Sequence, residues 1–323
     1  MKEYYIAAND AGQRLDRFLG KTVPLLPSSL AQKYIRLKRI KVGHKAAKHD
    51  YKLCVGDTVQ MYINDEFFET PRAENAYLRI TDPSLDIIYE DENILLINKE
   101  AGTLCHSDSG FDYATTVSRL QAYLYKKGEW RPRDENAFCP SLCNRIDRNT
   151  SGIVIAAKNA ETLRIINEKI RQREIDKYYL AAVHGIPRPP SGMLEGHIFK
   201  DSVKNMVFVS KNSSPGSKPA ATVYKTVATS GSIALLECKL ITGRTHQIRA
   251  QLSDIGHPII GDGKYGSERL DKPYDDKYQA LCSYKLVFAF TSDSGMLRYL
   301  DGSVFQLRDI PFVQKYFPGA RML

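Results

Sequence analysis

One segment, residues 144–158 (NRIDRNTSGIVIAAK), constrains the fold most strongly, because a charged turn leads directly into an unbroken apolar run. The run at 152–157 is typical of a strand that is covered on both faces. In the turn before it, Asp147 lies between Arg145 and Arg148. Neighbouring guanidiniums favour an ionised carboxylate, and a buried strand would hold it rigidly. The segment predicts a nucleophilic or charge-stabilising carboxylate at Asp147, with a structural ion pair in a surface turn as the alternative.

A second segment, residues 242–266 (TGRTHQIRAQLSDIGHPIIGDGKYG), predicts a short helix with a basic beginning. Three apolar residues share one face of that helix, namely Ile248, Leu252 and Ile255. Arg244 and His246 fall in the predicted first turn, where the helix dipole favours an anion, and Arg249 lies one turn further. The alternative is a capped amphipathic helix whose basic end is incidental.

Residues 144–158 closely resemble the signature of the RluA-type pseudouridine synthases, H-R-L-D-R-x-T-S-G followed by an apolar strand and A-K. Asn144 stands in place of the His of that signature, and Ile146 in place of the Leu. Residues 242–266 match the family's T-G-R-T-H-Q-I-R-x-x-L-x-x-x-G-H-P-I-x-G-D-x-x-Y-G, and residues 177–185 match K-x-Y-x-A-x-V-x-G. Motifs need context, and agreement over three separate segments supplies it.

The resemblance implies that uridine in RNA is isomerised to pseudouridine. The glycosidic bond breaks, the uracil rotates, and the ring rejoins the sugar through carbon 5. No redox change or energy input is needed, so no cofactor is expected. No metal is expected either, because the C-x-x-x-C pair Cys139 and Cys143 has no second C-x-x-C or H-x-x-x-H beside it. Asp147 would be the catalytic carboxylate, acting either as a nucleophile or as a base that removes a sugar proton to give a glycal. Arg249 would pair with Asp147 and keep it ionised. Tyr179 would stack near the flipped uracil and is a candidate acceptor for the proton on carbon 5.

The resemblance also indicates residues that contact RNA. A base must leave its stack before it can react, which requires cations for the phosphates and a side chain to fill the gap. Arg145 matches the position that can enter the RNA stack in the RluA type. Further candidates for RNA contact are Arg148, Arg244 and His246. Lys99, in a segment that resembles the family's K-P-x-G, is a candidate for RNA contact or site support.

The first 70 residues carry a dense positive stripe. Eight basic residues are opposed only by Asp50 between positions 33 and 52. The pieces RLDRFL, SLAQKYIRLKRIKV and GDTVQMYI resemble the αL RNA-binding motif, a small α/β domain of ribosomal-protein type. Lys38, Arg39 and Lys41 are the expected RNA contacts in it. A solvated basic face without a partner is the alternative.

The implied fold is α+β, with a mostly antiparallel central sheet, flanking helices and an active site in the central cleft. Three regions are expected: an αL-type RNA-binding domain at 1–70, a linker at 71–80 and a catalytic domain at 81–323.

Local signals predict several elements. We expect a helix at 115–127, a helix capped by Asn159, and a second N-terminal helix capped by Ser28 or Ser29. Residues 187–219 are predicted to form an irregular connection with a short strand at 206–209.

The composition agrees with a basic, RNA-binding protein. The chain has 323 residues, of which 43% are hydrophobic, and a net charge of +9, which suggests two or three domains and an anionic partner. No apolar run reaches the ~18 residues of a membrane span, and the N-terminus lacks the apolar core of a signal peptide. Six cysteines are too few for a disulfide framework, so we expect a cytoplasmic protein, and a monomer by default.

Two other function classes stay open on the sequence. One is a non-catalytic RNA-binding or ribosome-assembly factor on the same scaffold. The other is an Asp-dependent nucleosidase, which would release free uracil. The family acts on ribosomal and transfer RNA, and the N-terminal module favours large-subunit ribosomal RNA, with tRNA as the alternative.

Overall fold

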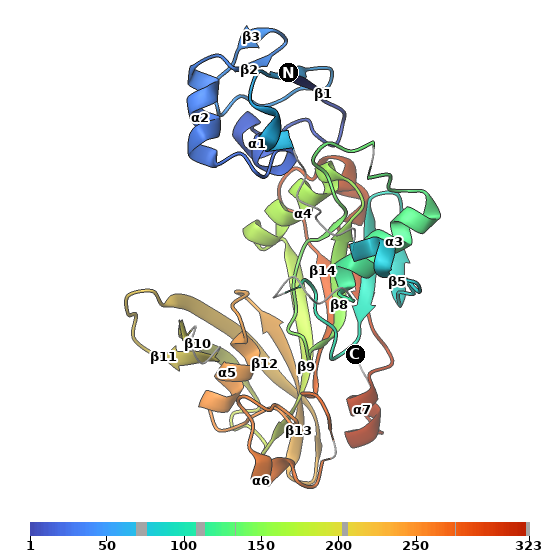
Figure 1. Ribbon diagram of the computed structural model, residues 1–323. Helices are drawn as coiled ribbons and strands as arrows, with labels where there is room; N and C mark the ends of the chain where they lie inside the picture. The colour runs from blue at the N-terminus through green and yellow to red at the C-terminus, as the bar shows by residue number, and fades with distance from the viewer. Residues whose placement is uncertain (69–75, 108–113, 133, 202–205, 275, 321–323) are drawn as a thin grey trace.

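The computed structural model describes residues 1–68, 76–107, 114–132, 134–201, 206–274 and 276–320. They form a small N-terminal domain beside a larger body that is built on one long sheet (Figure 1). The longest described helix, α4 (Ala160–Gln172), has 13 residues, so no helix within these ranges could cross a bilayer.

The N-terminal domain packs two helices against a four-stranded sheet of order β1-β4-β2-β3. Its elements are β1 (Lys2–Tyr5), α1 (Leu15–Thr22), α2 (Ser28–Arg36), β2 (Ile40–Val42), β3 (Lys45–Ala46) and β4 (Thr58–Met61). Leu15, Phe18 and Leu19 of α1 are buried in its core. The predicted cap at Ser28 or Ser29 is wrong. Ser28 is already helical, so the capping position falls to Pro27, which makes no side-chain cap bond.

The body contains an 11-stranded sheet whose main path runs β11-β10-β12-β13-β9-β14-β8-β6-β5. Its strands are β5 (Ile87–Glu90), β6 (Ile94–Lys99), β7 (Ser141–Leu142), β8 (Ser151–Ala157), β9 (Ile175–His184), β10 (Ser191–Asp201), β11 (Met206–Ser210), β12 (Lys218–Ser230), β13 (Ile233–Leu240), β14 (Leu281–Phe288) and β15 (Val304–Gln306). The pairs are antiparallel except β14 with β8, which is parallel. The predicted α+β fold with a mostly antiparallel sheet is confirmed.

Helices cover both faces of this sheet. The remaining α-helices are α3 (Thr116–Lys127), α5 (Gln247–Asp254), α6 (Glu268–Asp271) and α7 (Pro311–Tyr316), and the 3-10 helices are η1 (Asp65–Phe68), η2 (Ala76–Arg79) and η3 (Gly295–Leu300). As predicted, Asn159 caps α4 through its side chain. Thr115 was expected inside the helix at 115–127, but it precedes α3 and caps it through its side chain.

Strand β8 is buried on both faces, as its apolar run predicts. Val154 and Ala156 join the hydrophobic cluster that includes Leu120 of α3. Ile153 joins the opposite cluster, which includes Ile166 of α4. The two clusters fix the strand that follows the Asp147 turn.

Gly152 lets β8 approach β14 more closely than any side chain would permit. Its φ is +112°, and a Cβ atom there would lie 2.2 Å from the carbonyl oxygen of Ser283. Both the backbone conformation and the contact with a neighbouring backbone therefore require glycine.

We expect Gly152→Ala to lower the free energy of unfolding by about 3 kcal/mol or more, because backbone atoms of Ser283 must move. Urea unfolding measures the change. Gly20→Ala is the control, since a Cβ at that exposed helical position meets nothing within 4 Å. The control should be neutral or slightly stabilising. Equal stability of the wild type and Gly152→Ala would contradict the close approach.

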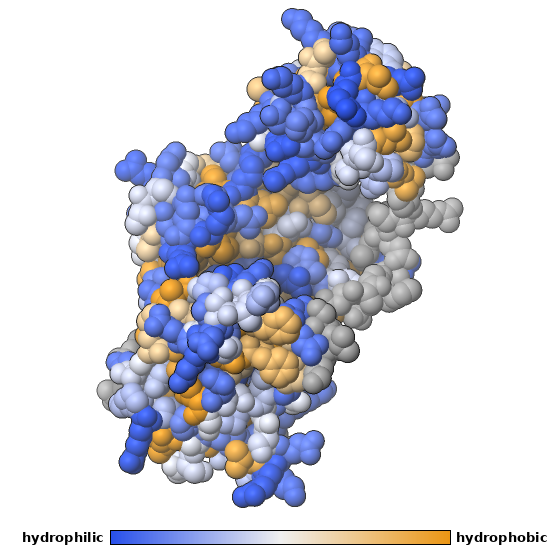
Figure 2. Space-filling view, turned by 90° about the vertical axis from the view of Figure 1, so that its left-hand side faces the viewer, coloured by the Kyte–Doolittle hydropathy of each residue, from blue (hydrophilic) through white to orange (hydrophobic). Residues whose placement is uncertain are grey.

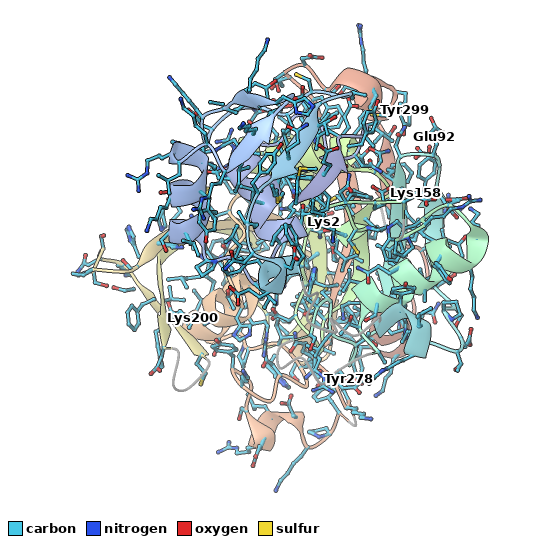
Figure 3. The ribbon with its side chains drawn as sticks, turned by 45° about the horizontal axis from the view of Figure 1, so that its top comes forward. Lys2, Glu92, Lys158, Lys200, Tyr278 and Tyr299 are labelled. Atoms are coloured by element: carbon cyan, nitrogen blue, oxygen red, sulfur yellow. The ribbon has the colours of Figure 1, made fainter. Side chains whose placement is uncertain are left out.

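The prediction for residues 187–219 is wrong in part. The segment was expected to be irregular, but residues 191–201 form the long strand β10, which pairs with β11 and β12 (Figure 3 labels Lys200 on it). A Cβ at Gly196 would lie 2.9 Å from the carbonyl oxygen of Ser210. Glycine is needed here for close strand approach.

The predicted linker, 71–80, lies partly outside the described residues, which resume at Ala76. Tyr77 of η2 packs edge-on against Tyr125 and Trp130 of the body, with ring centroids 5.1 and 5.0 Å apart. The N-terminal domain contacts the body directly, because the Asn136 amide donates to the Asp10 carboxylate at 2.7 Å. The domain boundaries stay a prediction.

Candidate functional site

The turn that carries Asp147 is held at several points by backbone and side-chain hydrogen bonds. The Oδ1 atom of Asn144 accepts from the backbone amide of Ile155 on β8 at 2.8 Å. The backbone carbonyl of Arg148 accepts from the amide of Gly102 at 2.9 Å, and the Arg148 Nε donates back to the Gly102 carbonyl at 3.0 Å. Asn144, which replaces the family's His, thus ties the turn to the buried strand.

Lys99 supports this turn from inside the body. Its side chain is buried, and Nζ donates to the carbonyls of Glu100, Thr103 and Arg148 at 2.9, 2.8 and 3.0 Å. Burial lowers the pKa of Lys99 to about 8, while nearby negative charges, including Asp147, oppose that shift. Of the two roles predicted for Lys99, these contacts favour site support over RNA contact.

Asp147 forms an ion pair with Arg249, as the resemblance implied. Nη1 of Arg249 lies 2.7 Å from Oδ2 of Asp147, although the two residues are 102 positions apart. Asp262 binds the rest of the guanidinium, at 2.7 Å to Nε and 2.8 Å to Nη2. One arginine therefore bridges two carboxylates.

The two carboxylates differ in exposure. The Asp262 side chain is fully buried and that of Arg249 is 6% exposed, whereas that of Asp147 is 26% exposed. Burial acts to lower the pKa of Arg249, but its hydrogen bonds to Asp262 and the charges of both carboxylates raise it. Burial acts to raise the pKa of Asp262, and Arg249 together with two backbone amides lowers it. The buried ion pair of Arg249 with Asp262 therefore fixes the guanidinium in place, and the guanidinium in turn orients Asp147.

His246 and Tyr265 border the same ion pair. Nδ1 of His246 lies 2.9 Å from the Tyr265 hydroxyl, and that hydroxyl accepts from the amide of Val207 at 2.8 Å. Nε2 of His246 lies 3.9 Å from Oδ2 of Asp147, too far for a hydrogen bond. Burial lowers the pKa of His246, so a neutral imidazole faces Asp147 near pH 7.

The basic segment before α5 differs from its prediction. Arg244 and His246 were expected in the first turn, but α5 begins at Gln247, and His246 precedes it with a φ of 52°. Oε1 of Gln247 accepts from the Arg244 amide at 3.0 Å, so the Gln247 side chain satisfies a donor there. Ile255, expected on the apolar stripe, is 39% exposed because the helix ends before it.

Tyr179 lies on β9, opposite Cys238 of β13 and Ser283 of β14. Its side chain is 6% exposed and packs in the main hydrophobic cluster. Burial raises the pKa of Tyr179, and the charge of Asp147 raises it further. The phenol is therefore protonated at neutral pH and lies close enough to Asp147 for the two groups to interact.

The other predicted RNA-contact residues lie at the surface. Arg145 and Arg148 are exposed on the Asp147 turn, and the half-buried Arg244 donates through Nε to the Pro219 carbonyl at 3.1 Å. Lys38, Arg39 and Lys41 lie in the N-terminal domain, where Arg39 and Lys41 stack over the rings of Tyr34 and Tyr62, at 5.5 and 5.4 Å. Figure 2 shows the surface hollowed between the N-terminal domain and the lower part of the body.

Asp262 and Tyr265 are the site residues that the sequence reasoning missed. Both belong to the quoted G-D-x-x-Y-G pattern at the end of residues 242–266, so the signal was present. No role was assigned to Asp262 from this pattern, because nothing in the neighbouring sequence shows that its side chain is fully buried.

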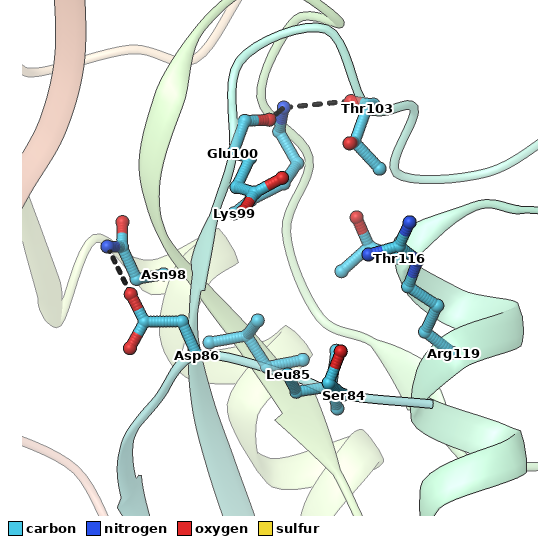
Figure 4. A pocket seen from close by; sticks show the side chains of 10 residues that line it. Ser84, Leu85, Asp86, Asn98, Lys99, Glu100, Thr103, Thr116 and Arg119 are labelled. Carbon is cyan, nitrogen blue, oxygen red and sulfur yellow. Dashed lines mark hydrogen bonds between the residues drawn. The ribbon is translucent and has the colours of Figure 1, made fainter. Parts of the chain in front are cut away.

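A separate cavity of about 310 Å³ lies beside β6, with Lys99 in its wall (Figure 4). Thr116 and Arg119 of α3 and Asp86 contribute to its wall, whereas Asp147, Tyr179 and Arg249 do not. The cavity is therefore not the site built around Asp147. Within the described ranges, His, Cys, Asp and Glu side chains form no group of three that could hold a metal ion.

Comparison with known proteins places this geometry in context. The model of the RNA pseudouridylate synthase family matches residues 93–254, which contain Asp147, Tyr179 and Arg249. The protein named ribosomal large subunit pseudouridine synthase C from Vibrio vulnificus is 34% identical over 81% of this chain and 79% of its own. The protein of the same name from Escherichia coli K12 is 32% identical over 83% and 80%.

Solved structures show the same fold. Human RNA pseudouridylate synthase domain containing 4 superposes with a TM-score of 0.56 at 21% identity, over 73% of this chain and 93% of that one. Human RNA pseudouridylate synthase domain containing 1 gives a TM-score of 0.52 at 20% identity, over 74% and 96%.

Proposed function

Because the chain belongs to the RNA pseudouridylate synthase family, we propose that it isomerises uridine in large-subunit ribosomal RNA, with Asp147 as the catalytic carboxylate. The observation that carries the proposal is the ion pair of Asp147 with Arg249, which the buried Asp262 fixes in place. The names of the bacterial relatives favour large-subunit ribosomal RNA over tRNA as the substrate.

The geometry suits either route for Asp147. Oδ2 is bound to Arg249, and Oδ1 has no hydrogen-bond partner among the described residues, so Oδ1 is available to the nucleotide. Attack by Oδ1 on the sugar carbon forms an ester and breaks the bond from the sugar to nitrogen 1 of uracil. The rotated uracil then displaces Asp147 through carbon 5, which loses its proton, while nitrogen 1 gains one. Removal of a sugar proton by Oδ1 would instead give a glycal. In both routes Arg249 keeps the carboxylate ionised and oriented.

Tyr179 would act as a stacking surface for the uracil. Its raised pKa makes the phenolate scarce at neutral pH, which disfavours Tyr179 as the base that takes the proton from carbon 5. A protonated phenol can still pack against the base and donate a hydrogen bond.

The N-terminal domain would anchor the RNA. Replacing Lys38, Arg39 and Lys41 together by alanine should weaken RNA binding and reduce the slope of log K against log salt by about 2 to 3, since each phosphate contact contributes nearly one. Filter binding at several salt concentrations measures this. The triple exchange Lys38→Arg, Arg39→Lys and Lys41→Arg keeps the charge and should keep the slope. An unchanged slope in the alanine variant would remove this face from the RNA interface.

The activity is tested with purified protein and unmodified transcripts of large-subunit ribosomal RNA and of tRNA, without added cofactor. Pseudouridine at discrete sites in the ribosomal transcript is the expected result. Modification of the tRNA transcript alone would mean that the substrate is tRNA and not ribosomal RNA. Release of free uracil would indicate a nucleosidase, and binding without conversion would indicate a non-catalytic factor.

A further inference from the structure

Lys177 is a cation on the active-site side of the sheet that the proposed chemistry does not use. It is half-buried on β9, directly opposite Leu240 of β13 and Leu286 of β14. No described residue provides it with a hydrogen-bond acceptor or an ionic partner. Burial lowers the pKa of Lys177, and no neighbouring carboxylate offsets that shift.

The other buried or half-buried lysines of the body differ from Lys177 in this respect. Each of them has an oxygen acceptor within 3.0 Å, as seen for Lys99, Lys158, Lys169, Lys239 and Lys285. A half-buried ammonium without an acceptor costs free energy. Such a group is commonly retained for a ligand, because functional sites are where local stability rules are broken.

Strand register places Lys177 next to Tyr179. Residues at i and i+2 of a strand point to the same face, about 6.5 Å apart, so Lys177 and Tyr179 are neighbours on one face. β9 pairs with β13 without a register shift over this range, and the bulge in the pair with β14 lies on β14. Tyr179 in turn lies within electrostatic reach of Asp147.

We propose that Lys177 binds a phosphate flanking the flipped-out uridine and thereby holds that nucleotide against Tyr179. The inference rests on the proposed function, because it takes Tyr179 as the surface under the uracil. A phosphate supplies the anion that the described residues do not provide here. Lys177 is in this account a positioning residue.

The contact forms only after the nucleotide has left its stack, so it should affect turnover more than binding. Lys177→Met should lower the single-turnover rate at saturating RNA by about 10- to 100-fold, the range of one charge-assisted hydrogen bond. The dissociation constant should change by less than about threefold. Lys177→Arg should recover part of the rate. Lys225→Met, at an exposed lysine of β12, is the matched control and should react at the wild-type rate.

Stability separates this role from a structural one. Replacing a half-buried, unpartnered charge by an apolar side chain of similar length should leave the melting temperature unchanged or raise it. A slower reaction in a protein that is at least as stable supports the proposal. A lower melting temperature with an unchanged single-turnover rate would mean that Lys177 serves the fold, and would overturn it.

The phosphate is identified with substrates that carry one neutral methylphosphonate, on the 5′ or the 3′ side of the modified uridine. With the wild type, one of the two should react as slowly as Lys177→Met does on normal RNA. Combining that substrate with the variant should add no further loss. Additive losses at both positions would overturn the assignment. This test uses the wild type and Lys177→Arg if Lys177→Met does not fold. If the wild type converts no uridine at all, the proposed function fails, which is a distinct result.

Discussion

Replacing Asp147 by alanine should lower the single-turnover rate of pseudouridine formation by about 10³-fold or more, because no other described group is placed to take over its role. RNA binding should stay within a few-fold of the wild type, since the cations that contact RNA are unchanged. The rate is measured as tritium release from RNA labelled at carbon 5 of uridine, and binding is measured in parallel.

Two variants serve as controls for Asp147. Asp147→Asn keeps the shape but loses the charge, and it should be nearly as slow as Asp147→Ala. Asp254→Ala removes an exposed carboxylate at the end of α5, the helix that carries Arg249, and should react at the normal rate. Normal turnover in Asp147→Ala would show that the reaction centre lies elsewhere.

Replacing Arg249 by methionine should impair both stability and activity. It leaves Asp262, which is fully buried, without its ion-pair partner, and breaking a buried pair in this way costs about 3–5 kcal/mol. It also releases Asp147, so the rate should fall by about 10²-fold or more. Urea unfolding and single-turnover kinetics measure the two effects.

The pH dependence tests the electrostatic origin of the Arg249 effect. In the wild type the pKa of Asp262 is lowered, so its contribution to stability is present above its ordinary pKa, near 3.9, and is lost as the pH falls through the lowered value. In Arg249→Met an unpaired Asp262 should favour its protonated form. The stability gap between the two proteins should therefore narrow as the pH is lowered from 7. A constant gap would point to lost packing instead.

A second change separates the two roles of Arg249. Arg249→Met with Asp262→Asn removes the uncompensated charge, while the new amide oxygen can still accept from the Lys264 and Tyr265 amides. The double variant should recover much of the stability and none of the activity. Arg171→Met is the control for an exposed pair, and it should change stability by less than about 1 kcal/mol.

Much of the frame around Asp147 could be predicted because its signals are local. The apolar run of β8 is long enough to indicate burial on both faces, and Asn159 caps α4 by a pattern that sequence shows directly. The pairing of Asp147 with Arg249 could not be derived from spacing, since 102 residues separate them. It was expected only from the family resemblance.

The remaining features depend on tertiary contacts that no local pattern encodes. β10 was missed because residues 187–219 were expected to be irregular, whereas residues 191–201 pair with both β11 and β12. The start of α5 was misplaced because the Gln247 side chain bonds back to Arg244. The role of Asp262 appears only when Arg249 is seen between two carboxylates.

The role of Asp147 can be measured in cells by a transcriptome-wide map of pseudouridine in ribosomal RNA and tRNA, with either the wild type or Asp147→Ala. If Asp147 is the catalytic carboxylate, the variant should lose one or a few discrete sites in large-subunit ribosomal RNA, with all other sites unchanged. An identical map in both strains, with the variant still bound to RNA, would contradict it.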